Sequence, residues 1–176
     1  PLSYTLLKNI LPIGAAMILE TADQQILMEE RGKVEIPGKY HPAPAGGCET
    51  REWRVFPEPF RCIKGEAWEE TAMLPGTDYG DVTLLGLARD RTEGFNPVFT
   101  YHSQTQLELK KVIEKAQSIA PEAAEHQRLF GVPANAEGLL QFCQQNQEKI
   151  IGNGLGELLV YGNYKFGPAW LSLARQ

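Results

Sequence analysis

Cysteine, long apolar runs and clustered positive charge are all scarce in this sequence of 176 residues. The three cysteines, Cys48, Cys62 and Cys143, are odd in number, widely spaced and without a Cys-x-x-Cys pair, which argues against a disulfide framework or a zinc knuckle. No segment has the length and apolar purity of a membrane span, and residues 1–16 lack the basic start and long apolar core of a signal peptide. We therefore expect a soluble protein of the reducing cytoplasm with no membrane partner.

Basic charge is neither in excess nor concentrated on one stretch. The formal net charge is -5, and the 17 Lys and Arg residues are scattered. A phosphate-backbone binder needs a basic face, so we expect no long nucleic acid as partner. A small phosphate ester held through metal ions remains compatible with an acidic protein. No Gly-x-Gly-x-x-Gly follows a predicted strand either, so a Rossmann nucleotide site has no support.

Apolar periodicity predicts an alternation of strands and helices that begins with a hairpin. Residues 14–20 and 25–30 are predicted strands joined by a polar turn, which makes the first β unit antiparallel. A long loop over residues 32–59 follows, rich in Pro and Gly. The remaining expected elements are a helix from Pro59 to about Met73, strands 82–88 and 97–104, a helix over 105–118, a strand over 128–133 and a helix capped by Asn135.

The chain begins with a predicted β-hairpin and lacks repeated β-α-β units. This order favours an α+β fold, in the form of an α/β/α sandwich with a mixed β-sheet. We expect one hydrolase-like domain over residues 1–147. Residues 148–176 are interpreted as a C-terminal extension, with a helix around 155–161 and an irregular end. This extension either packs on the domain or forms a homodimer interface.

Three carboxylates stand out on the predicted helix after Pro59. Glu66, Glu69 and Glu70 are spaced i, i+3 and i+4, which places them on one helix face, where like charges repel. A hard divalent cation such as Mg²⁺ would remove that repulsion and leave positions for water and substrate phosphate. The alternative is a solvated acidic face. Trp68 points off this face and is interpreted as a core residue.

The surroundings of this triple resemble the box of the Nudix hydrolase family. Pro44-Ala45-Gly46-Gly47 precedes it across a loop, and Glu66-Ala67-Trp68-Glu69-Glu70-Thr71-Ala72 carries the helix motif. The likeness covers about residues 15–142. It implies a pyrophosphohydrolase that uses Mg²⁺ or Mn²⁺ to cleave a nucleoside diphosphate linked to another moiety, of the ADP-ribose, nucleotide sugar or dinucleotide type.

The resemblance also implies roles for individual residues. Glu66, Glu69, Glu70 and the backbone of Gly47 would hold the metal, and Glu66 or Glu125 would accept a proton from water. Apart from the resemblance, the residue types themselves suggest substrate contacts from Gly46, Tyr40, Arg89 and Trp53. For the last three the plainer alternatives are local packing, a solvated turn and the anchoring of a long loop.

Two positions depart from the family pattern. Gly65 stands where the family has an arginine that holds a carboxylate, and Ala72 stands where it has a glycine. The loss of the arginine keeps a second hypothesis open, a catalytically silent Nudix-fold module that binds a ligand or regulates.

Overall fold

The chain builds one mixed sheet in a computed structural model that describes residues 13–32, 36–48, 58–89, 97–118 and 126–174. Five strands lie in the order β3 (Tyr40–Pro42), β2 (Gln25–Arg31), β1 (Gly14–Glu20), β6 (Pro97–Gln104) and β5 (Thr83–Arg89). Two more pair off this path: β4 (Ala45–Gly47) with β1, and β7 (His126–Pro133) with β2. The pair of β1 and β6 is parallel, and the others are antiparallel.

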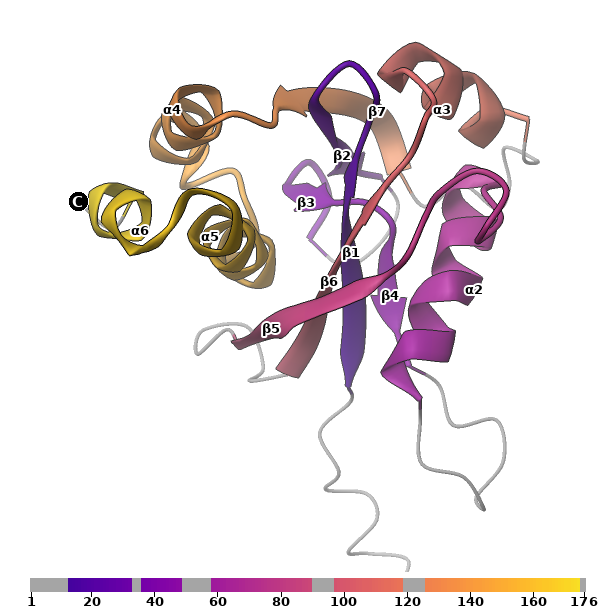
Figure 1. Ribbon diagram of the computed structural model, residues 1–176, viewed down its shortest axis with the longest axis horizontal. Helices are drawn as coiled ribbons and strands as arrows, with labels where there is room; N and C mark the ends of the chain where they lie inside the picture. The colour runs from indigo at the N-terminus through magenta and orange to yellow at the C-terminus, as the bar shows by residue number, and fades with distance from the viewer. Residues whose placement is uncertain (1–12, 33–35, 49–57, 90–96, 119–125, 175–176) are drawn as a thin grey trace, which may run out of the picture.

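Helices cover both faces of this sheet (Figure 1). One face carries α2 (Pro59–Thr71) and α3 (Leu109–Ala116), and the other carries α4 (Ala136–Asn146), α5 (Gly152–Phe166) and α6 (Pro168–Ala174). A separate apolar cluster fills each interface. The expected α/β/α sandwich with a mixed sheet is confirmed.

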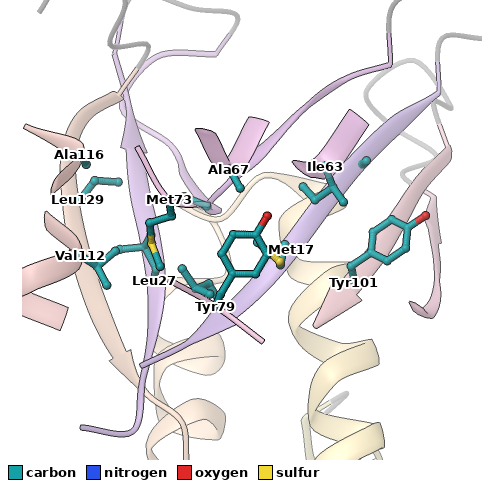
Figure 2. Close-up of a cluster of buried hydrophobic side chains, with 13 residues drawn as sticks. Met17, Leu27, Ile63, Ala67, Met73, Tyr79, Tyr101, Val112, Ala116 and Leu129 are labelled. Carbon is teal, nitrogen blue, oxygen red and sulfur yellow. The ribbon is translucent and has the colours of Figure 1, made fainter. Parts of the chain in front are cut away.

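The central strand β1 contributes side chains to both clusters, which explains its unbroken apolar run. Met17 and Leu19 belong to the cluster under α2 and α3, and Ile18 between them belongs to the cluster under α4, α5 and α6. Figure 2 shows Met17 grouped with Ile63 and Ala67 of α2 in the first cluster. Each such fully buried side chain contributes about 1.5–3 kcal/mol.

Most predicted elements are confirmed, and the differences concern short or glycine-rich segments. The helix after Pro59 ends at Thr71, followed by Ala72 in the left-handed conformation at φ 53°. Asn135 caps α4 by accepting a hydrogen bond from the Gly138 backbone N–H at 2.8 Å. The expected loop 32–59 contains β3 and β4, each too short for a detectable period. The prediction of an irregular C-terminal end was wrong, because Pro168–Ala174 form the helix α6.

The C-terminal segment lies against the sheet in the described part of the chain. Gly154 of α5 allows close approach, since a Cβ there would lie 2.8 Å from His41 Cδ2. At its other end α5 is joined to β1, where Tyr161 Oη donates to Glu20 at 2.9 Å and Lys165 pairs with the same carboxylate. The domain boundary at residue 147 and the dimer interface stay predictions.

Among the helices of the described residues, we find none with the length and apolar character that crossing a membrane requires.

Candidate functional site

A cavity of about 230 Å³ opens where β1 changes its antiparallel partner. β1 pairs with β2 only at its last residue, Glu20 opposite Ile26, whereas its first three residues pair with β4. Strands β1 and β2 therefore diverge toward the start of β1. The cavity at this end is lined by residues of β1, β2, β3 and β4, among them Gly14, Glu29, Arg31, His41 and Ala45–Gly47.

Helix α2 packs against β4 and brings two of its carboxylates to that strand. The buried Glu70 accepts a hydrogen bond through Oε2 from the Ala45 backbone N–H at 3.1 Å. One turn earlier, the Glu66 carboxylate lies directly over Gly46, where an added Cβ would be 2.2 Å from Glu66 Cδ. Gly46 is thus required to leave room for a carboxylate.

Negative charge at Glu70 is poorly compensated. Burial and the neighbouring carboxylates of Glu29 and Glu66 raise the pKa of Glu70 well above its ordinary value, against the opposing effects of the Ala45 N–H and His41. The side chain is only 9% exposed, so water screens it weakly. A cation beside these carboxylates would stabilise the arrangement.

A buried histidine, His41, lies between Glu29 and Glu157. His41 Nδ1 is 3.7 Å from Glu29 Oε1, and His41 Nε2 is 3.3 Å from Glu157 Oε1 of α5. Burial alone would lower its pKa, but the ion pairs with Glu157 and Glu29 raise the pKa of His41 to about 9. Arg31, at 3.8 Å from Glu29, adds a second cation to the wall of the cavity.

Of the other predicted site residues, those that the structure describes lie outside the lining of the cavity. Glu69 is exposed beside Glu70, and Arg89 is exposed at the end of β5, outside the lining of the cavity. Tyr40 packs on Phe130 and Phe142, with ring centroids 5.0 and 6.2 Å away, in the cluster on the opposite face. Trp53 and Glu125 lie outside the described residues.

The interpretation of Trp68 as a core residue was wrong. Its side chain is 53% exposed, because the inward face of α2 is made by Ile63, Ala67, Glu70 and Thr71.

Sequence reasoning missed Glu29, Arg31 and Glu157. Strand alternation offers a signal for Glu29, which lies two residues after Leu27 and so shares the face toward α2. Glu157 is the single charged residue between Lys149 and Lys165, and in the structure it is fully buried. A lone acid inside a long uncharged stretch of sequence is a signal that a buried partner exists.

The oxygen donors at α2 and β4 suit a hard divalent cation. No three His, Cys, Asp or Glu side chains of the described residues converge into a ready metal-binding group. Glu66 and Glu70 nevertheless meet at β4, and the charged form of Glu70 is only partly compensated by the Ala45 N–H and His41. Carboxylate and carbonyl oxygens are the ligands that Mg²⁺ takes, together with waters.

Comparison with known proteins identifies the fold. No protein-family model and no curated protein matches the sequence. Among solved structures, a MutT protein from Methanosarcina mazei Go1 is 16% identical with a TM-score of 0.57, covering 87% of this chain and 94% of its own. A Nudix hydrolase from Nitrosomonas europaea has 16% identity and a TM-score of 0.57, covering 87% of this chain and 88% of its own.

The Nudix domain of Shewanella oneidensis NrtR, solved as a complex with ADP ribose, is 10% identical with a TM-score of 0.55. It covers 94% of this chain and 99% of its own. At these identities the likeness is one of fold, and the chain has the Nudix fold.

Proposed function

We propose that this protein is a divalent-metal-dependent pyrophosphohydrolase that cleaves a nucleoside diphosphate linked to another moiety. The observation that carries the proposal is the meeting of Glu66 and Glu70 with the Ala45–Gly47 strand at the edge of a cavity, in a Nudix fold. The products would be a nucleoside monophosphate and a phosphorylated remainder.

In this proposal the carboxylates of Glu66, Glu69 and Glu70 and the backbone carbonyl of Gly47 hold Mg²⁺ or Mn²⁺. When bound, the ion neutralises charge on the diphosphate and lowers the pKa of water. Glu70 is fixed by the Ala45 N–H, whereas Glu69 remains exposed to solvent. The site thus combines one carboxylate held by the backbone with one that is free to turn toward a bound metal ion.

The residues of the cavity would bind the diphosphate and move the proton. Arg31, 21% exposed at its side chain, offers a guanidinium to phosphate oxygens. Without a Cβ, Gly46 lets a phosphate approach the backbone. Glu66 or Glu125 would accept the proton of the attacking water, and Tyr40, Arg89 and Trp53 stay as further substrate contacts predicted from the sequence.

ADP-ribose is the first substrate to test. The Nudix domain of Shewanella NrtR was solved with ADP ribose and shares its fold with nearly the whole of this chain. A nucleotide sugar and a dinucleotide complete the panel, because each contains the same phosphoric anhydride bond.

The test is a screen of this panel with millimolar Mg²⁺ or Mn²⁺, with phosphate-bearing products read by mass spectrometry. We expect a nucleoside monophosphate from at least one compound, with no product when both metals are replaced by a chelator. Binding of a panel compound without product from any of them, with either metal, would refute turnover.

That refuting outcome describes the second candidate, a Nudix-fold module that binds a ligand without cleaving it. The feature that favours it is Gly65, where the family has its arginine. Among the described residues nothing lies within 4 Å of a Cβ placed at Gly65, so a side chain can begin there without a clash.

The Gly65→Arg variant therefore separates the two candidates. Replacing an interior helix glycine should raise the free energy of unfolding by about 0.5–1 kcal/mol. If the missing guanidinium limits the site, kcat/KM should rise in the variant or turnover should first appear. A variant with the higher melting temperature but unchanged hydrolysis would show that the arginine position does not limit turnover.

A further inference from the structure

Two of the three cysteines meet between β4 and α2. Cys48 directly follows β4 and Cys62 lies in the first turns of α2, and both are half-buried free thiols packed on the cluster that contains Tyr101. Their thiols are in hydrogen-bond contact with each other. Cys143 is buried in the cluster on the opposite face of the sheet.

The packing of the two elements explains this contact. Ala45 meets Glu70, Gly46 meets Glu66 and Cys48 meets Cys62, so strand and helix run in opposite directions. Two strand residues advance about 6.6 Å and four helix residues about 6 Å. The spacing that places Glu66 over Gly46 therefore also places Cys62 beside Cys48.

We propose that Cys48 and Cys62 form an oxidation site, at which a peroxide joins them in an intramolecular disulfide between β4 and α2. The thiolate of one cysteine attacks a peroxide oxygen, which breaks the O–O bond, forms a sulfenic acid and releases hydroxide. The thiolate of the other then attacks the sulfenic sulfur, forms the S–S bond and releases the oxygen as hydroxide. Together with the two thiol protons, the two hydroxides give two waters for each hydrogen peroxide reduced.

Contact between the thiols makes the second step faster than competing reactions of the sulfenic acid. Because the partner thiol already touches the sulfenic acid, the bond forms without a large movement of the backbone. The cross-link would enclose residues 49–61 in a covalent loop and tie the strand of Gly46 to the helix one turn before Glu66. This chemistry does not depend on the proposed hydrolase activity.

The test uses the whole wild-type chain, reduced and then treated with stoichiometric hydrogen peroxide. We expect titratable thiols in the denatured protein to fall from the three of the sequence to one, and the intact mass to fall by two hydrogens. Trypsin should then release residues 40–51 joined to residues 62–64, and dithiothreitol should separate them.

Matched variants identify the pair. Cys143→Ser should still form the joined peptide, whereas Cys48→Ser and Cys62→Ser should each fail to form it. Retention of all three thiols in the oxidised wild type, a disulfide to Cys143, or cross-linking between two chains in place of the internal bond would overturn the proposal.

Discussion

At the scale of single residues, Gly46 is the position with the strictest steric requirement in the site. A Cβ at this position would lie 2.2 Å from Glu66 Oε1, so Gly46→Ala must displace the carboxylate. Because the displaced atoms are the far end of a flexible side chain, the free energy of unfolding should fall by no more than about 1 kcal/mol. We expect kcat/KM to fall by about tenfold or more in a steady-state assay of the cleaved panel compound.

Gly80→Ala provides the matched control for this prediction. Its nearest contact would be the Gln104 carbonyl oxygen at an ordinary 3.7 Å, and Gly80 lies outside the cavity lining. Both the melting temperature and kcat/KM should stay at wild-type values. If Gly46→Ala hydrolyses substrate as fast as Gly80→Ala does, the position of the Glu66 carboxylate is irrelevant to turnover.

Ala72 carries backbone strain that a glycine would avoid. At φ 53° it ends α2 in the left-handed region, which costs a residue with a Cβ about 1–2 kcal/mol. Glycine loses more conformational entropy on folding, about 0.5–1 kcal/mol. Ala72→Gly should therefore raise the free energy of unfolding in urea titrations by up to about 1.5 kcal/mol, the difference between these two effects.

The exposed mid-helix position Gln141 tests whether this gain is specific to a left-handed residue. Gln141→Gly places glycine inside α4 and should lower the free energy of unfolding by about 0.5–1 kcal/mol. A loss of stability in Ala72→Gly similar to that of Gln141→Gly would contradict the strain at Ala72.

At the scale of elements, α5 is coupled to the sheet through a titrating histidine. Four groups face His41 or its partners: Glu29 and Arg31 from β2, Glu70 from α2 and Glu157 from α5. The folded pKa of about 9 exceeds the ordinary 6.5, so the stabilisation from protonated His41 is complete below pH 6.5. It is lost as the pH rises through 9.

We therefore expect the free energy of unfolding to fall between pH 6.5 and 9 by a few kcal/mol at most. The measurement is urea denaturation of the wild type and of His41→Gln across this range. The variant should be less stable at pH 6.5, because Glu157 loses its partner, and the difference between the two proteins should narrow toward pH 9. A constant difference over the whole range would show that His41 is not charged in the folded protein.

Elements with a strong apolar pattern were predictable from the sequence, and those fixed by close packing were not. β1 is an unbroken apolar run, and α2 has apolar residues at spacings of three and four. The predicted bounds of both, and those of β6, agree with the structure to within two residues. The short strands β3 and β4 have three residues each and derive their conformation from partners distant in the sequence. In α5, Gly154 packs against His41 and Gly162 packs against Trp170. Because the buried face of this helix includes glycines, a search for regularly spaced apolar side chains does not detect the whole helix.

At the scale of the whole molecule, the same limit applies to the site. The glutamates of α2 were recognisable because they lie on one helix in one motif. The cations of the cavity come from β2 and β3, and the partner of His41 comes from α5, more than a hundred positions along the chain. Only the assembled sandwich brings Glu29, His41 and Glu157 together, so residue spacing alone could not indicate this cluster.

The central claim is that the carboxylates of α2 at β4 form the active centre, and Glu70→Gln tests it most directly. Glutamine keeps the shape, can accept the Ala45 hydrogen bond and removes a buried charge, so without metal the melting temperature should not fall. The measurement is the initial rate of diphosphate cleavage at saturating Mg²⁺ for the wild type and the variant. The account predicts a loss of about 100-fold or more in the variant. A well-folded Glu70→Gln protein that cleaves the substrate at the wild-type rate would contradict it.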